Sequence, residues 1–292
     1  MEEAVQERKI GPFEKRIHEI DFVRGVLMCL VIMDHLFNLL MSYNRTWMGA
    51  EGLQPFKFFY DVFHFYWSWP YSWGPNIWGI NMSLRMIVRY VALGGFCFLS
   101  GISSAFSRNN WKRAIEMIIL WAIIFLGSNL LQLWYSNSNL NLGIETFRID
   151  LNVIGVLAFS TLIYCFFQNK SWKVLAIVAA VGLALHITVQ ICRMVNPHFG
   201  ENIYFPFLWK PSDWVAKQAD YMPLVPYISF FFGGVILSRF TYSKNKVSYF
   251  KRHEWERPIC FLGRHSLIVY ASHFLLLMGI FALINLIVQA CI

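Results

Sequence analysis

The sequence predicts an all-α protein, a polytopic transmembrane helix bundle of about seven spans with one interfacial aromatic helix. Hydrophobic residues make up 57% of the 292 residues and charged residues only 14%, against about 25% in soluble domains. The chain also contains seven apolar stretches of a length that crosses a bilayer as a helix. Because no long polar stretch separates them, we expect one membrane domain over residues 20–292 after a charged tail, residues 1–19.

The predicted spans follow one another with short connections, and several lie near the lower length limit of about 17 residues. They are Ile20–Met41, Ile87–Phe106, Ala114–Trp134, Leu151–Phe167, Val174–Cys192, Leu224–Phe240 and Ser266–Val288. Between the first two, Pro55–Trp69 is dense in aromatic residues. Trp and Tyr favour the depth of the membrane interface, so this segment is expected to lie on the outer surface. A true extra span there would invert the topology downstream.

Basic residues predict the orientation. With the N-terminus inside, the tail and the inner loops hold sixteen Lys and Arg residues, whereas the outer segments hold seven. The positive-inside rule therefore places the N-terminus in the cytoplasm and the C-terminus outside. The net charge of +8 follows from this bias and does not indicate nucleic-acid binding. The six cysteines form no CxxC pair, so we expect neither a disulfide framework nor a metal site.

The first span carries ionisable residues that a lone transmembrane helix would not tolerate cheaply. A charge at the centre of such a helix costs at least about 2.5–3.5 kcal/mol, so Asp34 and His35 are expected to be functional. Arg24 lies eleven residues before His35, which places both on one helix face about 16 Å apart. Asp34 points about 100° away from His35, towards a neighbouring helix, and Asn38 is placed to orient the His35 ring. For Arg24, anchoring at the headgroups is an equal alternative.

Other polar residues stand at the ends of later spans. Asp220 precedes the sixth span and either caps it or points into a site. A buried histidine such as His273 is more often a satisfied interhelical hydrogen bond than a catalytic group. Arg148 and Asp150 precede the fourth span. We regard these four residues and Asn38 as candidate substrate-site residues.

Five stretches occur in an order that is similar to a known family. They are EIDFVRGVLMCLVIMDH, GGFCFLSGISS, IGVL, DYMPLVP and LGRHSLIVYASH. They resemble bacterial members of the heparan-alpha-glucosaminide N-acetyltransferase catalytic-domain family, which belongs to a larger set of transmembrane acyltransferases. Arg24 and His35 also match the Arg-x10-His pattern of the related acyltransferase-3 family, which implies an essential histidine on the first span.

The resemblance implies a membrane-bound O- or N-acetyltransferase in a bacterial cell membrane. It implies acetyl-CoA as the acyl donor on the cytoplasmic side, a sugar or glycan acceptor outside, and contact with membrane lipid. One departure is clear: the animal lysosomal enzyme has its histidine close before the small-residue motif, where this chain has none. The acceptor therefore stays open, as does the assembly, for which a homodimer is one candidate.

We expect His35 and Asp34 to be catalytic and four arginines to bind the donor, since guanidinium groups match phosphate geometry. These arginines are Arg24, Arg108, Arg113 and Arg264. The alternative is a transporter or flippase for a small molecule or a lipid-linked sugar, without acyl chemistry. Proton-coupled transporters usually carry several carboxylates at mid-membrane and repeated, interrupted spans, whereas this sequence has one deep carboxylate and no visible repeat.

Overall fold

The computed structural model describes residues 17–47, 84–138, 146–196, 199, 218–242 and 253–291. Within these ranges the regular structure is helical. The helices are α1 (His18–Trp47), α3 (Leu84–Ala105), α4 (Asn110–Ser136), α5 (Val153–Phe167), α6 (Trp172–Val195), α8 (Leu224–Thr241), α9 (Arg257–Arg264) and α10 (Ser266–Cys291), with a 3-10 turn at Glu254–Glu256.

The predicted fold class is confirmed, because each of the seven predicted spans lies on one of these helices. Six helices are long and apolar enough to cross a membrane, and α5 is a shorter apolar helix of 15 residues. The predicted interfacial helix Pro55–Trp69 and most of the N-terminal tail fall outside the described residues. The short helix α9 was not predicted separately from the last span.

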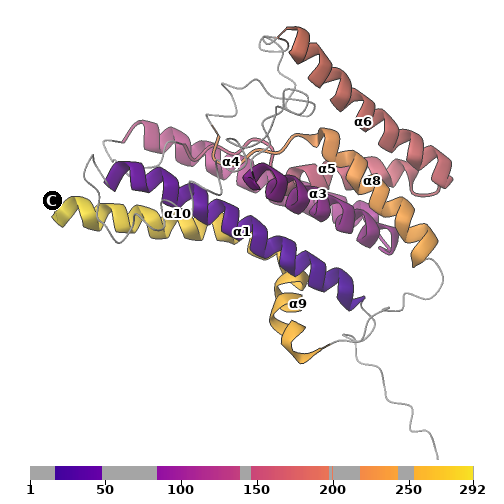
Figure 1. Ribbon diagram of the computed structural model, residues 1–292, viewed down its shortest axis with the longest axis horizontal. Coiled ribbons are helices and arrows are strands. Elements are labelled where there is room, and N and C mark those ends of the chain that lie inside the picture. The colour runs from indigo at the N-terminus through magenta and orange to yellow at the C-terminus, as the bar shows by residue number, and fades with distance from the viewer. Residues whose placement is uncertain are drawn as a thin grey trace, which may run out of the picture.

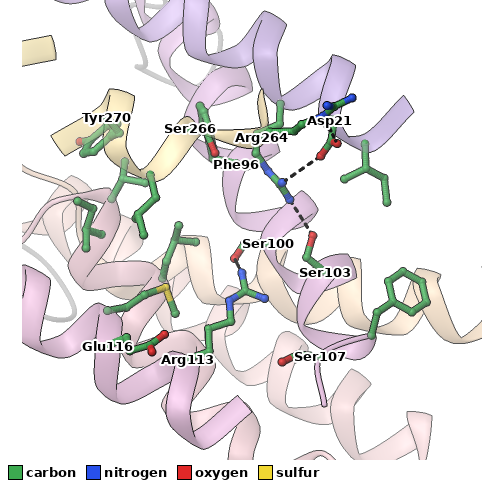
Figure 2. A pocket seen from close by; sticks show the side chains of 18 of the residues that line it. Asp21, Phe96, Ser100, Ser103, Ser107, Arg113, Glu116, Arg264, Ser266 and Tyr270 are labelled. Carbon is green, nitrogen blue, oxygen red and sulfur yellow. Dashed lines mark hydrogen bonds and ion pairs between the residues drawn. The ribbon is translucent and has the colours of Figure 1, made fainter. Parts of the chain in front are cut away.

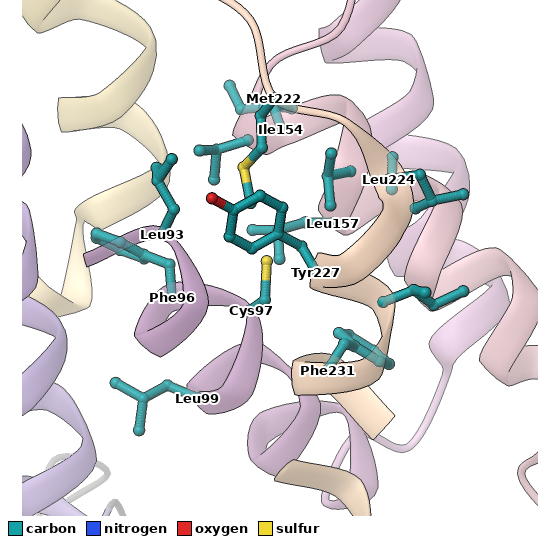
Figure 3. Packing of buried hydrophobic residues seen from close by; sticks show 14 of the residues in the cluster. Leu93, Phe96, Cys97, Leu99, Ile154, Leu157, Met222, Leu224, Tyr227 and Phe231 are labelled. Carbon is teal, nitrogen blue, oxygen red and sulfur yellow. The ribbon is translucent and has the colours of Figure 1, made fainter. Parts of the chain in front are cut away.

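Three helices form the centre of the bundle. α3 packs against α8, and α5 contacts both. α1 covers α3 and runs beside α10, whereas α6 packs on the outside of α8 and α4 on the outside of α5 (Figure 1). The largest apolar core fills the space between α3, α5 and α8, where Tyr227 lies among Leu93, Phe96 and Leu157 (Figure 3).

Glycines let the backbones of two helix pairs touch. A Cβ atom on Gly101 of α3 would lie 1.9 Å from the carbonyl oxygen of Phe231 on α8. A Cβ atom on Gly263 of α9 would lie 1.7 Å from the carbonyl oxygen of Asp21 on α1. Since no side chain fits at these distances, the small residues fix how closely α8 approaches α3 and how closely α9 approaches the start of α1.

An extended segment, residues 146–152, lies inside the bundle beside α4. Its backbone nitrogen atoms donate to side chains of α4, Phe147 to Gln132 Oε1 at 2.7 Å and Ile149 to Ser128 Oγ at 3.1 Å. Trp121 Nε1 donates to the Asp150 carbonyl at 2.9 Å. Non-helical backbone at membrane depth is tolerated only when its polar groups are satisfied by protein or face a cavity. These bonds meet that requirement.

The same segment explains why α5 is short. Trp121 lies eleven residues after Asn110, the first residue of α4. The start of α5, which lies beside Trp121, is therefore about 16 Å from the start of α4 along its axis. α5 then runs back to Gln168, whose side chain accepts from Asn110 Nδ2 at 3.2 Å. The sequence placed Asp150 at the outer end of a full-length span. The structure instead buries it beside α4, with 4% of its surface exposed.

A second extended segment, residues 218–223, pairs with the first. Ile149 and Asp220 form a parallel β-bridge, and Met222 N donates to the Leu151 carbonyl at 2.8 Å. The two segments lead into α5 and α8 respectively. This pairing fixes the backbone of Asp220 beside the segment that leads into α5.

Candidate functional site

One polar cavity, which we call the arginine cavity, has a volume of about 670 Å³ and opens between α1, α3, α4, α5 and α10. Its polar lining consists of arginines, serines and two carboxylates, and its remaining lining is apolar. The polar lining residues are Asp21, Arg24, Ser100, Ser103, Ser107, Arg113, Glu116, Arg264, Ser266 and Tyr270 (Figure 2).

Neighbouring groups hold each of the three arginines in place. Arg24 Nη2 donates to Ser103 Oγ at 2.7 Å. Arg264 Nε lies 3.3 Å from Asp21 Oδ2, and Arg24 Nη1 lies 3.8 Å from Asp21 Oδ1. Asp21 therefore links α1 to the end of α9. Because Arg24 and Arg264 both interact with the Asp21 carboxylate, Arg264 at the end of α9 lines the same cavity as Arg24.

Arg113 of α4 approaches from the opposite wall. Its Nη2 donates to Ser100 Oγ at 3.0 Å and its Nη1 to Ser104 Oγ at 3.1 Å, and Figure 2 shows the side chain directed at Ser100. The sequence favoured tight helix packing as the role of the small residues in GGFCFLSGISS. Gly101 packs in that way, whereas the serines also orient cavity arginines.

Positive charge dominates this cavity. Three guanidinium groups face Asp21 and the largely exposed Glu116. Such a surface, with hydroxyl groups interspersed, suits an anion bearing phosphates. Arg108 is exposed beyond the end of α3 and does not line the cavity. The structure thus brings together Arg24, Arg113 and Arg264, and a donor-binding role for Arg108 stays a prediction.

The histidine cavity, as we call the second polar cavity, lies near the middle of α1 and has a volume of about 320 Å³. It is lined by α1, α3 and the extended segment that precedes α8. The polar lining residues are Asp34, His35, Asn38, Arg85, Arg89, Gln218, Asp220 and Tyr221. The sequence predicted His35, Asp34, Asn38 and Asp220 as site residues, and the structure brings all four to this cavity.

Ionic contacts cross the histidine cavity from α3. Asp34 points away from His35 to a neighbouring helix, where Arg85 Nε lies 2.8 Å from Asp34 Oδ1. Arg89, one turn further along α3, donates from Nη2 to the Tyr221 carbonyl at 3.0 Å. The cavity therefore combines two arginines with the carboxylates of Asp34 and Asp220, an arrangement that is polar without a dominant sign of charge.

His35 lies beside a second histidine. Its ring centroid is 5.1 Å from that of His273 and 5.1 Å from that of Phe274, both on α10. His273 Nδ1 lies 2.8 Å from the Tyr270 carbonyl and 3.2 Å from the Val269 carbonyl. Because carbonyls only accept, Nδ1 carries the proton and the neutral ring has its lone pair on Nε2. That buried Nε2 has no hydrogen-bond partner among the described residues.

One hydrogen bond links the linings of the two cavities. Tyr270 lines the arginine cavity, and its hydroxyl donates to Asp220 Oδ2, which belongs to the histidine cavity, at 2.5 Å. Along α3, Phe96 of the arginine cavity and Leu93 of the histidine cavity are three residues apart, about 4.5 Å by helix rise. The cavities are therefore close neighbours at their inner ends.

Two of the candidate substrate-site residues lie elsewhere. Arg148 Nε and Asp150 Oδ1 form an ion pair at 3.0 Å, and Gln218 also donates to Asp150. Neither Arg148 nor Asp150 lines the arginine cavity or the histidine cavity. Their contacts support the extended segment 146–152, and a substrate role for them stays a prediction.

The sequence reasoning missed Arg85, Arg89 and Tyr270. The first was counted only as an outer basic residue, although it pairs with Asp34. Arg89 lies within a predicted span, where an ionisable residue is by default a candidate for function, so that rule would have found it. Tyr270 stands in the LGRHSLIVYASH motif, but no local pattern marked its hydroxyl as the link to Asp220.

The helices and cavities define an integral membrane protein with two adjoining polar sites inside its bundle. Over residues 61–275, more than half of its length, the chain matches the family described as heparan-alpha-glucosaminide N-acetyltransferase, catalytic. The chain belongs to this family, which implies membrane acetyltransferase activity. The match begins after α1, so it does not include Arg24 or His35. No similar curated protein and no similar solved structure was found.

Proposed function

We propose that the protein transfers an acetyl group from cytoplasmic acetyl-CoA to a sugar or glycan acceptor at the outer face of a bacterial cell membrane. The observation that carries this proposal is the adjacency of two different polar cavities. One is rich in arginine, as a phosphate-bearing donor requires, and the other holds a histidine beside a carboxylate-lined space. Tyr270 and Asp220 join them at their inner ends.

The donor would occupy the arginine cavity. Its phosphates would contact Arg24, Arg113 and Arg264, which surround the polar part of the cavity. The pantetheine arm would extend along α1 towards the histidine cavity, over part of the roughly 16 Å that separates Arg24 from His35 by helix rise. The thioester would then lie near the place where the cavities meet.

The acceptor would occupy the histidine cavity. A neutral His35 imidazole takes the proton from the acceptor hydroxyl or amine as that group attacks the thioester carbonyl. The tetrahedral intermediate collapses, the carbon–sulfur bond breaks, and the leaving thiolate receives the proton back from the imidazolium. Asp34 and Asp220 line the same cavity as His35, and their negative charge would stabilise the imidazolium formed during the reaction.

Purified protein in liposomes, given acetyl-CoA labelled in the acetyl group and an oligosaccharide mixture, tests this function. We expect label in the oligosaccharide, or slow release of labelled acetate when no acceptor is present. Arg113→Ala should weaken donor binding, and Arg257→Ala is the control because Arg257 is largely exposed, pairs with Glu254 and lines neither cavity. Flux of a sugar across the liposome membrane without label transfer would contradict the proposal and support a transporter.

A further inference from the structure

The inner end of the arginine cavity differs chemically from its mouth. Ser103, Ser107 and Arg113 lie at one end, and Figure 2 shows Tyr270 at the opposite side of the view from Ser107. Tyr270 shares the lining with Ser266, one turn earlier on α10, and with apolar side chains that include Phe96 from α3 and Ile154 and Leu157 from α5. A ligand with a charged head and a short apolar end would place its head at the arginines and its apolar end towards Tyr270.

Tyr270 also lies between the two cavities, because it lines the arginine cavity and is hydrogen-bonded to Asp220 of the histidine cavity. Phe96 and Leu93, which line the arginine cavity and the histidine cavity respectively, are less than one helical turn apart on α3. The Tyr270 hydroxyl donates a hydrogen bond to Asp220 Oδ2 of the histidine cavity, with 2.5 Å between the two oxygen atoms. Tyr270 is buried, with 6% of its surface exposed.

The two carboxylate oxygens of Asp220 differ in their hydrogen bonds. Its Oδ2 accepts from Tyr270, whereas Oδ1 has no hydrogen bond among the described residues. A carboxylate accepts several hydrogen bonds, so Oδ1 is available to a hydroxyl or amine that enters the histidine cavity. The backbone of Asp220 is fixed by its bridge to Ile149, and the phenol fixes the rotation of its side chain.

On the basis of the proposed function, we propose that Tyr270 has two roles in acyl transfer. Its ring closes the inner end of the arginine cavity and limits the donor to a short acyl chain. Its hydroxyl positions Asp220, whose second oxygen orients the acceptor. Tyr270 is thus the specificity-determining residue for the acyl group and a positioning residue for the acceptor side.

Substitution separates the two roles. Tyr270→Ala removes the ring and opens space beyond the inner end, so the ratio of kcat/KM for hexanoyl-CoA to that for acetyl-CoA should rise at least about 10-fold. Tyr270→Phe keeps the ring, so this ratio should stay at its wild-type value. Tyr270→Phe nevertheless loses the hydrogen bond to the charged Asp220 carboxylate. It should therefore lower the acetyl transfer rate by about 10-fold and raise the KM for the sugar substrate that receives the acetyl group.

Two control variants test whether a changed acyl ratio results from loss of the Tyr270 ring or from a general loosening of the protein. Met278→Ala shortens another buried side chain of α10 that lines neither cavity and should leave the acyl ratio unchanged. Tyr164→Phe removes a hydroxyl from a buried tyrosine that packs on Phe231 and Phe232 and lines neither cavity, so it should leave both ratio and rate unchanged.

Each result decides the proposal. A folded Tyr270→Ala protein with the wild-type ratio overturns the first role. A Tyr270→Phe protein with wild-type acetyl transfer overturns the second, and this variant still provides a test if Tyr270→Ala does not fold. If the wild-type protein transfers no acyl group from acetyl-CoA or hexanoyl-CoA, both the proposed function and this inference are overturned. The wild-type measurement therefore separates failure of the proposed function from failure of the Tyr270 proposal.

Discussion

Asp34 on α1 and Arg85 on α3 form a largely buried ion pair, with 2.8 Å between Asp34 Oδ1 and Arg85 Nε. The pair gives Asp34 a structural role in joining the two helices, in addition to the catalytic role that its depth in the first span predicts. Removing one partner of a buried pair typically destabilises a protein by about 3–5 kcal/mol, because the other charge is left uncompensated.

A double substitution separates the two roles of Asp34. Asp34→Asn alone and Arg85→Gln alone should each lower the unfolding temperature and the acetyl transfer rate. If Asp34 acts only through the ion pair, the combined variant should recover part of both losses. If Asp34 contributes its charge to the reaction, as we expect, the combined variant should recover stability but not rate. A combined variant with near wild-type transfer would show that Asp34 is structural.

Arg264 is expected to contribute to donor binding more than to the chemical step. It lines the arginine cavity and contacts Asp21, so Arg264→Ala should raise the KM for acetyl-CoA more than it lowers kcat. Arg257→Ala is the matched control, because Arg257 lies on the same helix, is largely exposed and pairs with Glu254. Equal KM values in the two variants would mean that Arg264 only sets topology.

The close contact between α9 and α1 makes a further prediction. A methyl group on Gly263 would lie 1.7 Å from the Asp21 carbonyl oxygen, so Gly263→Ala should push α9 away from α1, lower the unfolding temperature and raise the KM for the donor through Arg264. Gly279→Ala on α10 serves as control. Nothing lies within 4 Å of the added methyl there, and alanine favours a helix by up to about 1 kcal/mol. Equal unfolding temperatures would contradict the packing argument.

The helices of this fold follow from hydropathy, because each apolar stretch must form its backbone hydrogen bonds within itself at membrane depth. The extended segment 146–152 escaped that reasoning. Its hydrogen bonds go to Gln132 and Ser128 of α4 and to the segment at Asp220, residues that are distant in sequence. No local pattern distinguishes such a segment from the first turn of the next span.

The candidate site was only partly predictable for the same reason. Ionisable residues in apolar spans stand out singly, which is how Arg24, Asp34 and His35 were found. Their partners come from other helices: Ser103 for Arg24 and Arg85 for Asp34. Helix packing decides which polar residues contact each other, and this packing depends on contacts such as that of Gly101 with Phe231. A single sequence does not show which residues form such pairs.

The orientation of the protein stays a prediction that a reporter measures directly. Sixteen basic residues in the expected inner segments against seven in the outer ones favour a cytoplasmic N-terminus. A reporter fused after Ile292 should be active outside the cell, and one inserted at Ser107, between α3 and α4, should be active inside. A cytoplasmic signal from the C-terminal fusion would mean that a further stretch, such as residues 55–69, crosses the membrane.

The central claim is that His35 exchanges the proton during acyl transfer. His35 lines the histidine cavity together with Asp220 and lies beside His273, and the lone pair of a neutral imidazole can take the proton of the attacking acceptor. Loss of a general base typically lowers the rate by about 10²–10⁴. The exposed His265 at the end of α9 provides a matched control.

The direct measurement is acetyl transfer by His35→Ala compared with wild-type protein and His265→Ala, with acetyl-CoA binding measured for all three. We predict that His35→Ala binds acetyl-CoA with wild-type affinity, because the arginine cavity is intact, and transfers acetyl groups about 10²–10⁴-fold more slowly. His265→Ala should behave as wild type. Acetyl transfer by His35→Ala at the wild-type rate would contradict this mechanism and make His273 the next candidate for the base.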